Sequence, residues 1–381
     1  MNPITLRQPA TLVFGNGCAP QCADFLAQNG VRRVLLVSST PVLPRLDEVR
    51  QALKKCGLAV VLASPVDREP TEELFERILL MAQGEKIDSV LGIGGGSAID
   101  VAKLVAALAQ GRQPVREVFG INLLAGRQLP LVCLPTTAGT GAEVSPNAIL
   151  LDETDESKKG VISPHLVPDA AFLDPLLTLS VPPAVTAATG LDALTHCIEA
   201  YANKYAHPLV DTYALRGVEL IAANLARAVR EGSDTEARAA LALGSLYGGL
   251  CLGPVNTAAV HALAYPLGGR FRIPHGVANA LLLPHVLRFN FPAAPERYAE
   301  ISAALGVARS GTALARAEGG VEWLSRLSHD CGVPQRLSQL SIPRETIPWL
   351  ASSAMKVTRL LKNNLRLLTE ADAVAIYEAA Y

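Results

Sequence analysis

Ser89-Val-Leu-Gly-Ile-Gly-Gly-Gly-Ser-Ala-Ile-Asp100 joins an apolar run to a glycine turn and then to a helical pattern. The apolar run has the length of a buried strand, and a helix is expected from Ala98 onward. Glycines let the backbone approach a phosphate closely, and the N–H groups that begin a helix attract anions. We expect Ser97 to cap this helix, with Asp100 in its first turn. A tight strand–helix turn with an ordinary cap explains the same residues equally well.

The same alternation of short apolar runs and helical patterns extends through the first half of the chain. Strands are expected at residues 34–37, 59–62, 89–93, 131–134 and 171–173. Helices are expected at residues 46–56, 71–83 and 98–110. This order predicts a parallel sheet that is covered by helices.

The composition changes after Pro182-Pro183, where alanine and leucine dominate and a helical period continues to Tyr381. We therefore predict an α/β domain over residues 1–180 and an all-helical domain over residues 181–381. Residues 239–269 carry no charged side chain. Pro254 and several glycines interrupt this stretch, which indicates two buried helices rather than a membrane span.

Composition limits the partners and the compartment. The chain has 34 basic and 35 acidic residues, without a basic run, which argues against nucleic acid as a partner. Its seven cysteines are scattered and include no C-x-x-C pair, as expected of reduced thiols in a cytoplasmic protein. The first residues lack the pattern of a signal peptide. We expect a cytoplasmic protein that does not bind membranes.

Asp192-Ala-Leu-Thr-His196 places a carboxylate and an imidazole four residues apart, so that both project from one face of a helix. His261 lies in an apolar run and His275 in a turn, and we expect Gly268 and Gly269 to let the chain double back between them. Three imidazoles and one carboxylate suit Fe(II) or Zn(II) rather than Mg(II) or Ca(II). The sequence therefore predicts one divalent metal site.

A second polar loop follows the strand expected at residues 131–134. Pro135-Thr-Thr-Ala-Gly-Thr-Gly141 is rich in hydroxyl groups and small residues. Neighbouring parallel strands deliver such loops to the same sheet edge, where nucleotides bind in open α/β sheets. The G-x-G-x-x-G fingerprint is absent, so these residues alone fit a mononucleotide as well as a dinucleotide.

Four motifs, in this order, closely resemble those of the iron-containing (group III) alcohol dehydrogenases. They are Gly94-Gly-Gly-Ser-Ala-Ile-Asp100, Pro135-Thr-Thr-Ala-Gly-Thr-Gly-Ala-Glu-Val144, Gly190-Leu-Asp-Ala-Leu-Thr-His196 and Pro274-His-Gly276. The similarity runs from about Phe14-Gly15 to the final helices. It implies a doubly wound parallel-sheet dinucleotide-binding domain, then a helical metal-binding domain, in a dehydroquinate synthase-like architecture with the catalytic cleft between them.

The resemblance also implies an activity. Such a protein is a metal-dependent NAD(P) oxidoreductase that interconverts a small alcohol or hydroxy acid with its aldehyde or ketone by hydride transfer. Fe(II), or Zn(II) in its place, polarises the substrate oxygen. Proteins of this kind are commonly dimers and sometimes larger, so a homo-oligomer is expected.

Site residues follow from the same resemblance. It assigns the metal ligands to Asp192, His196, His261 and His275. It assigns cofactor contacts to Gly95, Gly96, Ser97, Asp100, Thr136, Thr137, Thr140, Asn147 and Lys159. Lys159 belongs to residues 153–159, a charged turn that would ordinarily be a solvated loop, and Lys158 is the alternative for the same role.

Tyr265 departs from the family pattern. Many relatives carry a histidine four residues after the third metal ligand, proposed to relay the alcohol proton, where this chain has Tyr265. A tyrosine with an ordinary pKa near 10 is a poor base at neutral pH. We expect Tyr265 to orient groups in the site rather than to titrate.

Ser39 departs from the pattern at the cofactor. NAD-preferring relatives often carry an aspartate at this position, which accepts the ribose 2′-hydroxyl and would repel a 2′-phosphate. Ser39 does neither, so NADP is not excluded, and Arg68 is a cation that could approach its 2′-phosphate. NAD remains the favoured cofactor.

Near the metal ligands, Leu252 is expected to form a pocket wall. Arg272, if it faces the cleft, would pair with a substrate carboxylate or phosphonate.

Other functions fit parts of this pattern. Dehydroquinate synthase-like and glycerol-phosphate dehydrogenase-like enzymes share the architecture, and a metallohydrolase would use a similar metal site without a dinucleotide. A metal or nucleotide sensor without catalysis is the simplest alternative. The Asp192/His196 pair and the Thr136–Thr140 loop favour the alcohol dehydrogenase branch.

Overall fold

The computed structural model describes residues 3–154, 156–308 and 310–381. The chain divides into two compact units. An α/β unit comprises Leu6–Thr137 and Gly141–Ser180. A helical unit comprises Ala138–Thr140 and Val181–Tyr381, together with residues 3–5.

The α/β unit is built on a six-stranded, wholly parallel sheet. Its order is β1 (Thr11–Phe14), β9 (Ala170–Leu173), β6 (Leu131–Pro135), β4 (Ser89–Gly94), β2 (Arg33–Val37) and β3 (Ala59–Leu62). Five of these strands were predicted, and β1 adds an edge strand. The predicted α/β architecture is confirmed.

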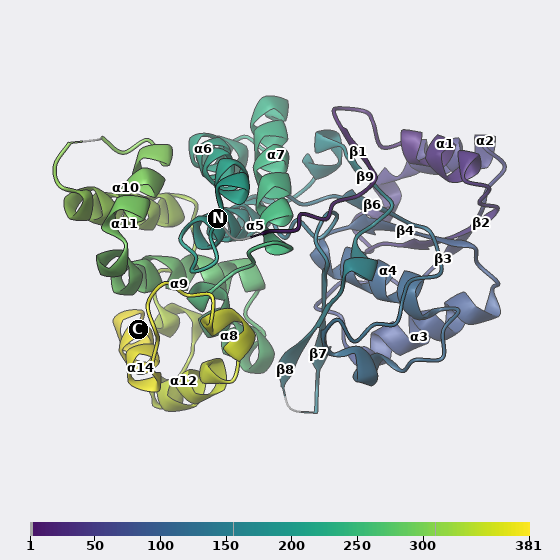
Figure 1. Ribbon diagram of the computed structural model, residues 1–381. Coiled ribbons are helices and arrows are strands. Elements are labelled where there is room, and N and C mark those ends of the chain that lie inside the picture. Colours follow the sequence, from purple (N-terminus) through teal and green to yellow (C-terminus); the bar gives the residue numbers. More distant parts are fainter. Residues whose placement is uncertain (1–2, 155, 309) are drawn as a thin grey trace. The chain divides into compact units, whose positions relative to one another are not determined.

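Helices cover both faces of this sheet (Figure 1). Val34 and Leu36 of β2 pack in one core with α1 (Gln21–Gln28) and α2 (Asp47–Lys55). Leu35 and Val37, which alternate with them, pack in a second core with α3 (Glu72–Gly84) and α4 (Gly96–Leu108). Such burial on both faces explains why the central strands read as continuous apolar runs.

Glycines allow α4 to lie directly on β4. A Cβ atom at Gly92 would be 2.7 Å from the Ala102 Cβ, and one at Gly94 would be 2.8 Å from the Ala98 Cβ. The expectation that Ser97 caps α4 with Asp100 in the first turn was wrong. The helix begins at Gly96, Gly95 is the N-cap without a side-chain cap, and Asp100 lies one turn further on.

A three-stranded sheet joins β5 (Gly120–Ile121), β8 (Ser157–Ile162) and β7 (Asn147–Asp152). The expectation of a solvated loop at residues 153–159 was wrong from Ser157 onward, because β7 and β8 form an antiparallel hairpin that pairs Leu150 with Lys159. Short 3-10 helices complete the unit at Leu43–Arg45, Val115–Val118, Pro164–Leu166 and Pro175–Thr178.

The helical unit confirms the predicted all-helical half. Its helices are α5 (Pro183–Tyr201), α6 (Pro208–Arg230), α7 (Thr235–Leu252), α8 (Ala259–Phe271), α9 (His275–Asn290), α10 (Pro295–Ala304), α11 (Ala313–Asp330), α12 (Ile347–Met355), α13 (Thr358–Leu361) and α14 (Glu370–Ala379). Short 3-10 helices lie at Phe291–Ala293, Leu337–Leu340 and Arg344–Thr346. Helix α5 is buried along most of its length and packs against α6, α7 and α9.

The uncharged stretch at residues 239–269 forms most of α7 and α8, as predicted. Within the described parts of the chain, no helix is both long and apolar enough to cross a membrane. The expected reversal at Gly268 and Gly269 was wrong, because α8 continues through both residues to Phe271. The chain turns instead at Arg272, whose φ is 56°, and the Ile273 N–H donates to the Leu267 carbonyl at 3.3 Å.

Candidate metal centre

Helix α5 supplies the first two predicted ligands from one buried face. Asp192 and His196 are 2% and 5% exposed, and Asp192 Oδ1 lies 3.9 Å from His196 Nε2. Gly248 of α7 makes room for this face, since a Cβ there would be 3.2 Å from the His196 Cβ. The i,i+4 spacing that was read from the sequence therefore directs both side chains to one point.

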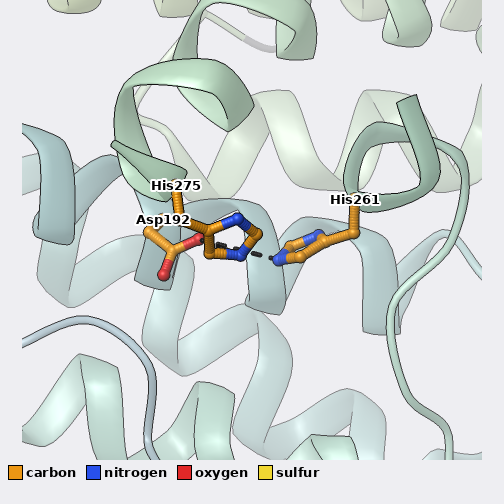
Figure 2. A group of neighbouring side chains, drawn as sticks. All are labelled: Asp192, His261 and His275. Carbon is orange, nitrogen blue, oxygen red and sulfur yellow. Dashed lines mark ion pairs between the residues drawn. The ribbon is translucent and has the colours of Figure 1, made fainter. Parts of the chain in front are cut away.

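Helices α8 and α9 bring the other two predicted ligands to the same carboxylate. His261 Nε2 lies 3.6 Å and His275 Nε2 lies 3.7 Å from Asp192 Oδ1. Ligand atoms of Asp192, His261 and His275 all lie within 4.8 Å of one another. Figure 2 shows the three side chains pointing toward each other. His196 adjoins this group, with its ring stacked on that of His261 at a centroid distance of 4.7 Å.

The separations fit a divalent cation with nitrogen and oxygen ligands. Two ligand atoms at about 2.1 Å from a tetrahedral cation are about 3.4 Å apart. The three imidazole nitrogens lie 3.6, 3.7 and 3.9 Å from Asp192 Oδ1, only slightly further. This donor set suits Fe(II) or Zn(II), and hard cations would demand more oxygen ligands.

Electrostatics keep the carboxylate ionised in a buried place. Burial alone would raise the pKa of Asp192, but the neighbouring His196, His275 and His261 hold it well below its usual range. Burial lowers the pKa of His196, which favours the neutral ring that can bind a metal. Burial also opposes a charged His261, but Glu199 and Asp192 on either side raise its pKa to about 10. A cation at His261 Nε2 would take the place of that proton.

Glu199 completes the site, and it was not predicted from the sequence. It lies on α5 with Asp192 and His196 and is 5% exposed. His261 Nδ1 donates to Glu199 Oε2 at 2.5 Å, and the Val260 N–H donates to Glu199 Oε1 at 2.6 Å. Glu199 thus caps the start of α8 and orients the His261 ring, as carboxylates behind metal-binding histidines do. Its spacing of three from His196 was the available signal.

Glu199→Gln is expected to lower the affinity for a divalent cation by roughly 10- to 100-fold. The Gln side chain can offer an N–H to His261 Nδ1, which favours the tautomer with a proton on Nε2, the nitrogen that faces Asp192. Titration of metal-stripped protein with Co(II) measures the affinity. Glu219→Gln, an exposed ion-pair change on α6, is the control. Equal affinity in both variants would contradict the orienting role.

Tyr265 lies beside the ligands and Arg272 lies at the turn between two of them. The Tyr265 ring centroid is 6.0 Å from that of His275, and Arg359 Nη2 donates to the Tyr265 hydroxyl at 2.8 Å. Arg272 is exposed at the end of α8. Leu252, the last residue of α7, is buried.

The predicted cofactor loops meet within the α/β unit. A Cβ at Gly95 would touch the Thr137 side chain at 3.5 Å, and the Thr136 N–H donates to the Gly94 carbonyl at 2.9 Å. Helix α4 begins directly after Gly95, so its first N–H groups belong to Gly96 and Ser97. Thr140 belongs to the helical unit, in the segment Ala138–Thr140.

Three predicted cofactor residues lie around the β7–β8 hairpin. Asp100 accepts the Ile149 N–H at 3.0 Å, and burial raises its pKa to about 7. Asn147 begins β7 and its side-chain oxygen has no hydrogen-bond partner among the described residues. Lys159 Nζ lies 3.9 Å from Asp152 Oδ2, whereas the side chain of the alternative Lys158 is 3% exposed and is paired with Glu69 at 2.8 Å.

Ser39 follows β2, at the carboxyl edge of the sheet. The next residue, Thr40, binds the Asp67 carboxylate through its N–H and its hydroxyl, each at 2.7 Å. Arg68 is exposed. The Asp67 carboxylate, which was not predicted from the sequence, therefore binds the residue that follows Ser39.

Family models match both halves of the chain. One, described as iron-containing alcohol dehydrogenase, matches residues 9–175, and a second, for the C-terminal part of that family, matches residues 186–381. The chain is 40% identical to long-chain-alcohol dehydrogenase 1 of Geobacillus thermodenitrificans over 376 residues, which cover 96% of this chain and 94% of that protein.

Solved structures agree with these matches. A crystal structure of 1,3-propanediol oxidoreductase has a TM-score of 0.96 and 34% identity, with all of both chains covered. Sulfoacetaldehyde reductase from Bifidobacterium kashiwanohense, in complex with NAD+, has a TM-score of 0.89 and 27% identity, covering 100% of this chain and 99% of that chain.

Proposed function

The chain belongs to the iron-containing alcohol dehydrogenase family, and we propose that it interconverts a small alcohol or hydroxy acid with its aldehyde or ketone, using NAD and a divalent cation. The convergence of Asp192, His261 and His275 ligand atoms within 4.8 Å carries this proposal. His196 is the fourth proposed ligand, 3.9 Å from Asp192 Oδ1.

The cation supplies Lewis-acid polarisation of the substrate oxygen, with Fe(II) as the proposed metal and Zn(II) as its substitute. The chain's own residues hold it and exclude water. Asp192 and His261 are almost fully buried, and the low dielectric around them would strengthen the attraction between the Asp192 carboxylate and the cation. Tyr265 receives a hydrogen bond from Arg359, which supports a role in orienting groups beside His275. Leu252 is the proposed apolar wall and Arg272 the proposed partner for an anionic substrate group.

The nicotinamide cofactor is proposed to bind at the carboxyl edge of the parallel sheet. N–H groups of Gly96 and Ser97 begin α4 there and suit the pyrophosphate. Thr136, Thr137, Thr140, Asp100, Asn147 and Lys159 are the remaining proposed contacts. The Asp67 carboxylate, which binds Thr40 next to Ser39, is proposed to lie near the ribose, where it would repel a 2′-phosphate and favour NAD over NADP.

We also propose a cytoplasmic, homo-oligomeric enzyme. All seven cysteines are free thiols, and six of them are buried, which suits a reducing compartment. Strand β3 leaves Val60 and Leu62 41% and 45% exposed at the edge of the sheet. An exposed apolar edge strand offers unpaired N–H and C=O groups with which another chain can pair, and this supports a homo-oligomer.

A substrate screen tests the activity. Purified protein, loaded with Fe(II) or with Zn(II), is mixed with short alcohols, diols, hydroxy acids or aldehydes and with either NAD or NADP. We expect a cofactor-dependent absorbance change with Fe(II), and a higher kcat/KM with NAD than with NADP. Absence of turnover with every metal and cofactor would contradict the proposed reaction and favour a metallohydrolase or a sensor.

A further inference from the structure

Asn279 stands among the proposed metal ligands, although no motif assigns it a role. It lies on α9, four residues after His275, and is 0% exposed. Its Nδ2 donates to Asp192 Oδ1 at 2.7 Å. The same nitrogen lies 3.1 Å from His261 Nε2 and 3.2 Å from His275 Nε2. One amide nitrogen therefore faces all three atoms of the ligand group.

We propose that Asn279 competes with the cation for the metal centre, because its carboxamide nitrogen lies against the same three ligand atoms that a cation would bind. The NH2 group has to leave before a cation can bind there. This inference rests on the proposed metal-dependent function, since it concerns the same four-ligand site.

The distances exclude joint occupancy. The ligand atoms of His261 and His275 lie 3.6 and 3.7 Å from Asp192 Oδ1. A cation bound to these three atoms at about 2.1 Å would lie among them, and the amide nitrogen, at 2.7, 3.1 and 3.2 Å from the same atoms, would be roughly 2–3 Å from it. That is too short for contact between a cation and an N–H donor. The N–H dipoles also direct their positive ends toward the same point, which adds repulsion.

The position of the Asn279 amide is explained by its hydrogen bond to Asp192. A buried carboxylate oxygen needs a donor, and the Asn279 N–H provides it for Asp192. Asn279 Oδ1, at the other end of the carboxamide, is buried with no hydrogen-bond partner among the described residues. The side chain is therefore held by its nitrogen alone, and rotation of the amide breaks no bond of its oxygen.

Competition predicts that removing the Asn279 amide raises the affinity for the cation. Binding that requires the Asn279 amide to break its hydrogen bond to Asp192 Oδ1 has a lower apparent affinity than binding to ligands that are already free. Removing the amide deprives Asp192 of its donor, so the metal-stripped protein loses stability and gains more from the cation. We expect Asn279→Ala to bind the cation about tenfold more tightly and to take it up faster.

The test uses the full-length chain, stripped with a chelator and titrated with Co(II), whose visible absorption reports its coordination. The affinity, the rate of uptake in stopped flow and the melting temperature with and without Co(II) are compared with those of the wild type. Asn290→Ala is the matched control, because Asn290 is a second buried asparagine of α9 and pairs with Asn364 at 2.8 Å. It should lower the melting temperature and leave the affinity for Co(II) unchanged.

Each outcome decides between the proposals. Tighter and faster binding in Asn279→Ala, but not in Asn290→Ala, supports competition. Unchanged or weaker binding in Asn279→Ala overturns it and leaves the metal centre intact. Equal Co(II) binding by the wild type and His261→Ala would overturn the proposed metal centre itself. Should Asn279→Ala fail to fold, Asn279→Ser, whose hydroxyl is too short to reach the same partners, gives the same readout.

Discussion

Asp192→Asn is expected to leave the protein folded, to abolish retention of a divalent cation and to lower kcat/KM for alcohol oxidation by at least about 10³-fold. The amide replaces the carboxylate with nearly the same volume, so the packing of α5 is preserved. It removes the one negative charge that faces three imidazole nitrogens at 3.6, 3.7 and 3.9 Å. Neutral amides bind Fe(II) and Zn(II) far more weakly than carboxylates do.

Metal content by mass spectrometry, after gel filtration, measures retention, and the absorbance of the reduced cofactor measures activity. Asp211→Asn is the control. Asp211 lies on the neighbouring helix α6 and forms an ion pair with Arg297 of α10 at 2.7 Å. That variant should keep both its metal and its activity. One equivalent of tightly held cation in Asp192→Asn would show that the histidines suffice, and Asp192 would then lose its proposed place as a ligand.

The α/β half was predictable because each central strand is short, apolar and buried on both faces. The run at residues 89–93 ends in glycines that let α4 lie against the sheet, and this local chemistry is visible in the sequence. β7 and β8 were missed for the opposite reason. Lys158 and Lys159 are typical of a solvated loop, and only long-range pairing with β7 makes them part of a strand.

The ligand face of α5 was predictable from helical spacing, because Asp192 and His196 lie one turn apart. Glu199 and Asn279 were not predicted, although each lies three or four residues from a predicted ligand on the same helix. A glutamate or asparagine at such a position is usually exposed and solvated. Their burial depends on how α5, α8 and α9 pack, and spacing along one helix does not contain that information.

The packing of α9 on α5 is itself open to test, and Gly276→Ala is expected to disrupt it. A Cβ at Gly276 would lie 2.2 Å from the Ala188 carbonyl oxygen and 2.6 Å from its carbon. Both are backbone atoms that cannot rotate away, so one helix has to shift. His275, the adjacent residue, would move with α9. Metal sites tolerate changes in ligand distance of only about 0.2 Å, so we expect at least a roughly 100-fold loss of affinity for Co(II).

We also expect Gly276→Ala to lose about 1–3 kcal/mol in its free energy of unfolding, as overpacked cores do. Urea unfolding of stripped protein measures this, and Co(II) titration measures the affinity. Gly319→Ala on α11 is the control, because a Cβ there meets only Val307 Cγ1 at 3.5 Å, an ordinary contact. That variant should gain stability, since alanine favours a helix over glycine. Wild-type affinity in Gly276→Ala would mean that His275 reaches the cation without this close approach. Ala188→Gly should not rescue the variant, because the clash is with the backbone of residue 188 and not with its methyl group.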